Sequence, residues 1–108
     1  MRAFRWAVLV MMAVVGCASQ HKAEVRPLHA AAGTSAVVSQ QLEQGNQLFA
    51  QQDWAGAQQV YLATIQADQT LAEAHYNLAL TLERLGAKAE ARKHYVAAAN
   101  LAPGNKVI

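Results

Sequence analysis

The distribution of apolar and polar residues divides the chain into three parts. Residues 7–15 form an uninterrupted apolar run (AVLVMMAVV), and residues 18–35 keep no sustained period of two or 3.6. From residue 36 onward, apolar or small residues recur at positions i, i+3, i+4 and i+7, a spacing that puts them on one face of a helix. This spacing predicts four helices, at about 36–51, 54–67, 71–85 and 88–101.

Residues at the expected helix ends agree with these boundaries. Asp53 precedes the second helix, and its carboxylate can cap the free N–H groups there. Thr70 followed by Glu73 has the pattern of a capping box before the third helix. Gly86 supplies a permissive backbone before the fourth helix, and Pro103 is expected to stop it.

The helical part of the chain repeats itself with a period of 34 residues. Small residues align with small residues and aromatic residues with aromatic residues, which indicates two copies of one structural unit. The aligned pairs are Gly45 with Ala79, Leu48 with Leu82, Ala57 with Ala91, and Tyr61 with Tyr95.

The second copy, residues 72–103, resembles the tetratricopeptide repeat. The first copy, residues 38–71, is similar but looser, with Gln41 where a tryptophan is common and Gln69 where a proline is usual. The resemblance implies an all-α fold in which two helix-turn-helix repeats form a short right-handed α-solenoid. The second copy keeps the signature residues Leu78, Ala79, Leu82, Gly86, Ala91, Tyr95, Ala98 and Pro103.

Helix packing within each unit is expected to depend on small residues. Ala79 and Ala91 let two helix backbones approach closely, while Tyr95 fills the space beside them. The residues expected to pack the repeats are Gly45, Leu48, Ala57, Tyr61, Leu78, Ala79, Leu82, Ala91, Tyr95, Ala98 and Pro103.

In this family the first helix of each unit lines a concave groove that holds a peptide or a partner's helix. Among the implied groove residues, Phe49, Tyr76 and Leu80 are expected at the surface, since exposed apolar clusters mark contacts. The implied binding residues are Leu42, Asn46, Phe49, Tyr76, Asn77, Leu80 and Arg84, with Glu43, Ala50, Glu73 and Glu83 beside them.

Two asparagines stand out in this set. Asn46 and Asn77 occupy positions where chaperone-binding members of the family place asparagines that grip a C-terminal carboxylate. Leu42 stands where such a clamp needs a lysine, so we do not expect a carboxylate clamp. The alternative is that both asparagines satisfy backbone groups in neighbouring turns.

The N-terminal segment has the pattern of a secretory signal. Arg2 and Arg5 precede the apolar run, which is shorter than the roughly 20 residues that a membrane span needs. The run ends in Val14-Val15-Gly16-Cys17, which resembles the lipobox of bacterial lipoproteins. That resemblance implies cleavage before Cys17 and a diacylglycerol on its thiol.

Two other interpretations of this segment stay open: a buried apolar cysteine, and ordinary signal cleavage after Ser19. Ala18 stands where an aspartate is the usual inner-membrane retention signal, so the resemblance implies an outer-membrane lipoprotein facing the periplasm, or otherwise a plain cell-membrane lipoprotein. We expect a signal peptide at 1–16 and the lipidated cysteine with a mostly disordered tether at 17–35.

The tether contains Pro27 and Gly33, and its histidines, His21 and His29, are expected to be solvated. The two repeats are expected to occupy 36–103, followed by a C-terminal tail at 104–108.

Composition excludes several classes of function. The chain has 108 residues, 54% of them hydrophobic and only 6% aromatic, enough for one small domain packed by aliphatic side chains. One cysteine excludes an internal disulfide framework and a multi-thiolate metal site. Beyond the leader, basic and acidic residues balance, so the chain lacks the dense basic face of a nucleic-acid binder.

No set of catalytic residues emerges, and no glycine-rich phosphate loop precedes a helix. His75 and His94 lie nineteen residues apart without a second ligand at i+4, so no metal site and no cofactor is expected. The chain is therefore not expected to be an enzyme.

The preferred function is a membrane-anchored interaction module, an adaptor in the assembly of a bacterial cell-envelope complex. Its partner would be an envelope protein or peptide, and the alternative is a non-enzymatic carrier of a periplasmic ligand. Because solenoids are usually stable with three or more repeats, we also expect an uncovered apolar face that self-association or another protein closes, the alternative being a marginal monomer whose short C-terminal tail folds over it. Its expected members are Val96, Leu101, Val107 and Ile108.

Overall fold

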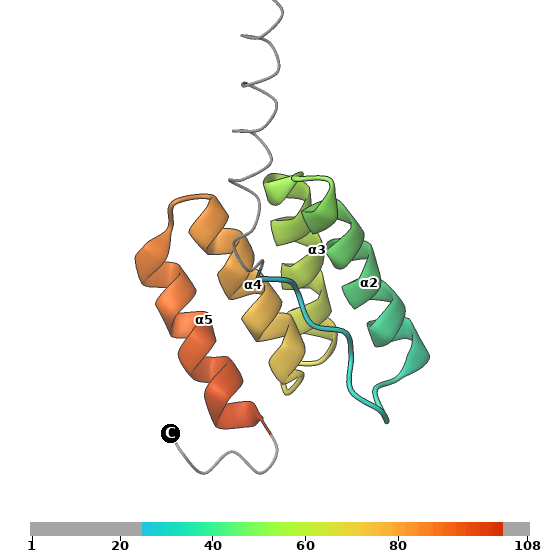
Figure 1. The fold of residues 1–108 in the computed structure, drawn as a ribbon. Helices are drawn as coiled ribbons and strands as arrows, with labels where there is room; N and C mark the ends of the chain where they lie inside the picture. The colour runs from blue at the N-terminus through green and yellow to red at the C-terminus, as the bar shows by residue number, and fades with distance from the viewer. Residues whose placement is uncertain (1–24, 103–108) are drawn as a thin grey trace, which may run out of the picture.

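The computed structural model describes residues 25–102, and four helices make up most of that range (Figure 1). The helices are α2 (Ala36–Ala50), α3 (Trp54–Ala67), α4 (Ala72–Arg84) and α5 (Lys88–Leu101). These bounds agree with the predicted ones to within one residue, and residues 25–102 contain no strand. The all-α prediction with two helix-turn-helix units is confirmed.

The predictions about Cys17, Pro103, Val107 and Ile108 concern positions outside the described residues. Within residues 25–102, no helix combines the length and apolar character needed to cross a membrane.

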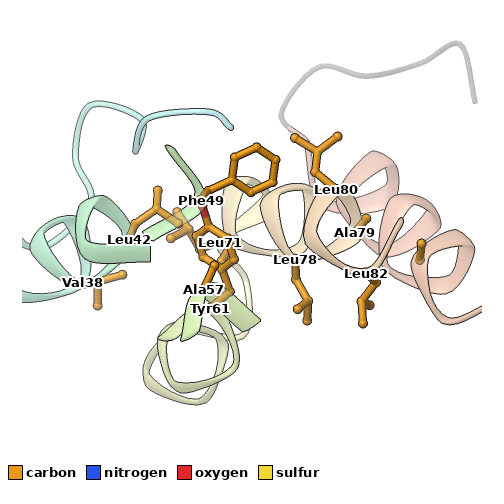
Figure 2. Packing of buried hydrophobic residues seen from close by; sticks show 12 residues of the cluster. Val38, Leu42, Phe49, Ala57, Tyr61, Leu71, Leu78, Ala79, Leu80 and Leu82 are labelled. Atoms are coloured by element: carbon orange, nitrogen blue, oxygen red, sulfur yellow. The ribbon is translucent and has the colours of Figure 1, made fainter. Parts of the chain in front are cut away.

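Each helix packs against the next one along the chain: α2 against α3, α3 against α4, and α4 against α5. The first helices of the two units, α2 and α4, also approach each other. A continuous cluster of buried apolar side chains, from Val38 to Leu82 and on to Ala91, holds the four helices together (Figure 2).

The closest packing joins α2 to α3. Tyr61 is fully buried with its ring against Gly45, and a Cβ atom at Gly45 would lie 2.7 Å from the ring carbon Cδ1. Real Cβ atoms do not come that near to a ring, so this approach requires glycine. Ala57, one turn before Tyr61, is also fully buried.

Side chains cap two of the four helices. The Ser35 hydroxyl accepts a hydrogen bond from the Val38 N–H at 3.3 Å, and the Asp53 carboxylate accepts one from the Gly56 N–H at 3.0 Å. The Asp53 cap is the predicted one, and it satisfies an N–H that has no partner inside the helix.

The predicted capping box before α4 is wrong. The Thr70 N–H and hydroxyl donate instead to the Asp68 carboxylate, at 3.0 and 2.7 Å. This side-chain turn precedes the helix, and α4 begins at Ala72 with no side-chain cap on the preceding Leu71. Leu71 occupies the N-cap position, so the Thr70 hydroxyl lies one residue too early to accept the N–H that a capping box requires.

The turns inside the two repeats, between α2 and α3 and between α4 and α5, have the same hydrogen bonds. After α2, the Asp53 N–H donates to the Leu48 carbonyl at 2.9 Å; after α4, the Ala87 N–H donates to the Leu82 carbonyl at 2.9 Å. This bonding is that of a Schellman motif, whose central residue takes the left-handed conformation. That residue is Gly86 in the second unit, with φ +87°, but Gln52 in the first unit, with φ +64°.

We predict that Gln52→Gly raises the stability of the protein. A residue with a Cβ atom is strained in the left-handed region, and removing that strain is worth about 1 kcal/mol. For a domain of this size the melting temperature should rise by about 4–8 °C. Thermal unfolding followed by circular dichroism measures the change. The matched exchange, Gly86→Gln, should lower the melting temperature; a fall for both variants would contradict the account of the turn.

Candidate functional site

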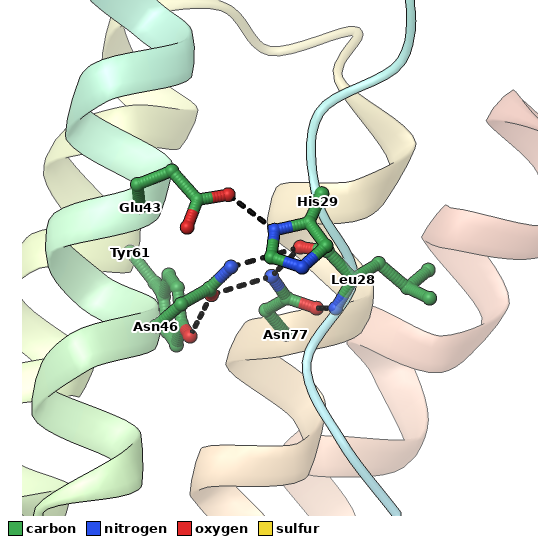
Figure 3. Close-up of polar contacts among 6 residues, drawn as sticks. All are labelled: Leu28, His29, Glu43, Asn46, Tyr61 and Asn77. Carbon is green, nitrogen blue, oxygen red and sulfur yellow. Dashed lines mark hydrogen bonds and ion pairs between the residues drawn. The ribbon is translucent and has the colours of Figure 1, made fainter.

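Asn77 of α4 holds the main chain of Leu28, a residue 49 positions earlier (Figure 3). The Leu28 N–H donates to Asn77 Oδ1 at 2.7 Å, and Asn77 Nδ2 donates to the Leu28 carbonyl at 2.8 Å. The amide thus pairs with both the N–H and the C=O of one residue, much as a neighbouring β-strand would. Asn77 is fully buried, so these bonds satisfy groups that water does not reach.

Asn46 of α2 also binds the Leu28 carbonyl, from the side opposite Asn77. Its Nδ2 donates to the Leu28 carbonyl at 3.1 Å, while its Oδ1 accepts a hydrogen bond from Asn77 Nδ2 at 3.1 Å. The Tyr61 hydroxyl also donates to Asn46 Oδ1. With both donors on Oδ1, the amide must present its Nδ2 to the peptide, so the orientation of Asn46 is fixed by its partners.

The Tyr61 hydroxyl remains a proton donor over the whole physiological range. Burial raises the pKa of this hydroxyl above its ordinary value, and the Glu43 carboxylate raises it further. The hydroxyl therefore stays protonated and keeps Asn46 in its gripping orientation.

A second contact lies on the exposed rim. The His29 Nδ1 atom is in hydrogen-bonding contact with the Glu43 carboxylate of α2 (Figure 3). The side chains of His29 and Glu43 are 80% and 43% exposed, so solvent weakens this contact. His29 was expected to be solvated, and the structure shows that it is both solvated and paired.

An aromatic surface flanks the peptide on one side. The rings of Phe49 and Trp54 meet edge to face with centroids 4.9 Å apart, and the Arg84 guanidinium lies 5.2 Å from the Trp54 centroid. A pocket of about 510 Å³ opens here, lined by these three residues and by Val25 and Pro27 among others. A cation over aromatic faces is attracted by their negative potential, which holds Arg84 in place.

On the other side Leu28 borders an apolar pocket of about 320 Å³ between α4 and α5. Its walls include Tyr76 and Tyr95, whose rings pack edge to face with centroids 5.5 Å apart. The Tyr95 hydroxyl donates to the Glu83 carboxylate at 2.7 Å.

The expectation of a disordered tether is wrong for residues 25–35. These residues form no helix, but Leu28 and His29 bind α2 and α4 and Ala30 packs against the core. Hydrogen bonds to buried amides offset the conformational entropy lost by this stretch, an effect that composition does not reveal.

Leu42 was expected to line the groove but is fully buried, because it belongs to the apolar cluster between the helices. Phe49 and Leu80 were expected to be exposed, yet they are only 7% and 5% exposed. The expectation of an exposed apolar surface is therefore wrong for these two residues, since both belong to the buried cluster.

The asparagines have neither of the partners considered from the sequence. Asn46 and Asn77 bind no carboxylate and no neighbouring helical turn, but an extended main chain from another part of the protein. Trp54 and His29 also belong to the site, although neither was expected there from the sequence. The apolar and basic residues of Val25-Arg26-Pro27-Leu28-His29, unusual in a tether, are the signal that could have indicated docking.

Among residues 25–102, no group of three or more His, Cys, Asp or Glu side chains is placed to hold a metal ion. The structure nevertheless brings two histidines together that the sequence leaves apart. The rings of His75 and His94 are stacked, with their Nδ1 atoms 3.2 Å apart, and His75 Nε2 lies 3.1 Å from the Gln69 carbonyl. A carbonyl only accepts, so His75 carries its proton on Nε2 and His94 Nδ1 donates to His75 Nδ1.

Comparisons with known proteins agree with the geometry. A family model described as TPR repeat matches residues 45–86, and one described as tetratricopeptide repeat matches residues 72–105. The matched residues cover more than half of the chain. The chain belongs to the tetratricopeptide repeat (TPR) family. Comparisons with curated proteins and with solved structures found no match.

Membership of the TPR family indicates the general role of the groove. TPR domains are protein–protein interaction modules and are typically scaffolds rather than enzymes. In this TPR domain, α2 and α4 are the first helices of the two repeats, and they supply the asparagines that hold Leu28.

We predict that Asn77→Asp destabilises the TPR domain. The carboxylate would present an acceptor to the Leu28 carbonyl and to Asn46 Oδ1, and it would bury a charge. The free energy of unfolding should fall by about 2–3 kcal/mol, measured by urea denaturation. The control is Asn100→Asp on the exposed end of α5, which should cost less than about 1 kcal/mol. Equal losses would show that the pairing with Leu28 contributes nothing.

The histidine pair predicts a pH dependence. Burial lowers the pKa of His94, and His75 and Lys93 lower it further, while Glu90 acts in the opposite direction. Between this lowered pKa and the ordinary value of about 6.5, the unfolded chain binds more protons than the folded one. Stability is therefore present at neutral pH and falls as the pH drops.

The melting temperature should decrease from pH 7.5 to 5.5, and His94→Gln should reduce this decrease. His29→Gln, on the exposed rim, should leave the decrease in place. The same decrease in all three proteins would rule out the histidine pair as its cause.

Proposed function

We propose that this protein is a membrane-tethered adaptor whose TPR groove holds an extended segment of a partner in the bacterial cell envelope. The groove carries the proposal, because Asn46 and Asn77 bind the N–H and C=O groups of a main chain. Every peptide offers those groups, whereas a small periplasmic ligand would have to imitate them. This chemistry favours an adaptor over a carrier.

The tether is the second part of the proposal. Its support is the basic and apolar leader that ends in Val14-Val15-Gly16-Cys17, which resembles a lipobox. A protein held by acyl chains on Cys17 would present its groove close to a membrane surface. Confinement to that surface would raise the effective concentration of both partners.

The experiment places a photo-crosslinking amino acid at Ala50, which is exposed and lines the larger pocket. Irradiation of living cells should give a specific adduct with an envelope protein. The control carries the same group at the exposed Gln59 of α3 and should not give that adduct. Adducts of equal mass and yield from both positions, or none from Ala50, would contradict an adaptor that acts through its groove.

The same cells test the tether. Cys17→Ser should move the protein from the detergent extract to the soluble fraction, because its acyl chains are lost. An intact mass that shows an unmodified Cys17 in the wild-type protein would contradict the anchor. An adduct of twice the chain mass from the Ala50 position would identify a second copy of the chain, in place of an envelope protein, as the occupant of the groove.

A further inference from the structure

We propose that residues 25–30 are a self-ligand of the TPR groove, and that a partner binds by displacing them with an extended peptide of similar pattern. This inference rests on the proposed peptide-binding function and adds both the partner's chemistry and a built-in competitor. We call residues 25–30 the self-ligand below.

The self-ligand is held by its main chain. Both polar backbone groups of Leu28 are bound by Asn46 and Asn77, in three hydrogen bonds of 2.7–3.1 Å. The Leu28 side chain is 44% exposed, so it is not the main attachment. Another peptide with the same extended backbone would make the same three bonds.

The self-ligand is joined to the repeats in a way that lets it fold back or leave. Residues 31–35 connect it to α2 through a turn, in which the Thr34 N–H donates to the Ala31 carbonyl at 3.2 Å and Gly33 has φ +94°. The first helix begins only after this turn, with Ser35 as its own cap. Neither the cap nor the Schellman turns involve residues 25–30, so these features do not require the self-ligand.

The self-ligand leaves room for a better occupant. Val25 is 53% exposed, although it borders the larger pocket, and the smaller pocket beside Leu28 has mostly apolar walls. A competing peptide with larger apolar side chains could bury more surface in both pockets.

The negative charge of Glu43 favours a basic residue at the ligand position that follows Leu28. In the self-ligand this residue is His29, which pairs with Glu43. A histidine, lysine or arginine at this place could pair with the same carboxylate, whereas an aspartate or glutamate would be repelled by it. The partner peptide therefore has a bulky apolar residue followed by a basic one.

Because the self-ligand belongs to the same chain, it competes at an effective concentration in the millimolar range. If the self-ligand has an intrinsic dissociation constant near 100 μM for the open groove, it weakens the binding of any outside peptide about tenfold. Even weak intrinsic binding of the self-ligand therefore suffices for strong competition with an outside peptide.

The test measures binding of a fluorescent, end-capped peptide with the sequence of residues 23–32 (AEVRPLHAAA) to the full-length protein in detergent. In one variant, Leu28→Pro, the N–H that donates to Asn77 is removed while an extended backbone is kept. This variant should bind the peptide about tenfold more tightly than the wild type. The matched control, Ala32→Pro, makes the same change at the second position of the turn that follows the self-ligand, where proline is tolerated, and should bind like the wild type.

A second variant replaces residues 25–30 with alternating Gly and Ser and should also gain affinity. If either variant is less stable, saturating peptide should raise its melting temperature by more than that of the wild type. This result would support the proposal, because it shows that the groove binds the same sequence in trans.

Equal affinity of wild type and variants would overturn the self-ligand while leaving the peptide groove intact. Absence of binding to all proteins would also overturn it. In either case the adduct at Ala50 would decide separately whether the groove serves an envelope partner.

Discussion

The contact between Tyr61 and Gly45 supports both the packing of the first repeat and its binding site. The ring lies against a glycine that has no Cβ atom, so α2 and α3 approach closely. From this position the Tyr61 hydroxyl donates to Asn46 and sets the direction of its amide. Asn46 can then bind Leu28 together with Asn77. Tyr61, a packing residue of the repeat, thus affects the binding of Leu28 through Asn46. Enlarging Gly45 would therefore disturb the core and the groove together.

The second repeat uses the equivalent tyrosine differently. Tyr95 is only partly buried, and its hydroxyl donates to the Glu83 carboxylate instead of a groove amide. Burial and this hydrogen bond both raise the pKa of Tyr95, so it too remains a donor. Its ring meets Tyr76 at the wall of the smaller pocket. The same signature position therefore orients an asparagine in one repeat and shapes an apolar wall in the other.

Much of the fold could be predicted because its determinants are local. Helical spacing gave the boundaries, Asp53 marked a cap, and Gly86 marked a left-handed turn. Features that depend on distant parts of the chain could not be predicted. The docking of Leu28 needs amides from two repeats at the right separation, and the contact of His75 with His94 needs the crossing of α4 and α5. The burial of Leu42 could not be predicted for the same reason, because the position of a residue on a helix does not determine which other element packs over its side chain.

A groove that binds main-chain groups has a consequence for specificity. Asn46 and Asn77 bind the main chain of the segment that precedes α2, and in the proposed function they would contribute affinity for any extended peptide. Selection among peptides must then come from the flanks, where Glu43 offers a charge and the two pockets offer apolar surface. The chain's own segment sets the threshold that any outside peptide must exceed. In the proposed mechanism, competition from residues 25–30 would exclude peptides that offer only their backbone and would admit those that also fill the pockets. The chain's own segment would thus make a general peptide site selective.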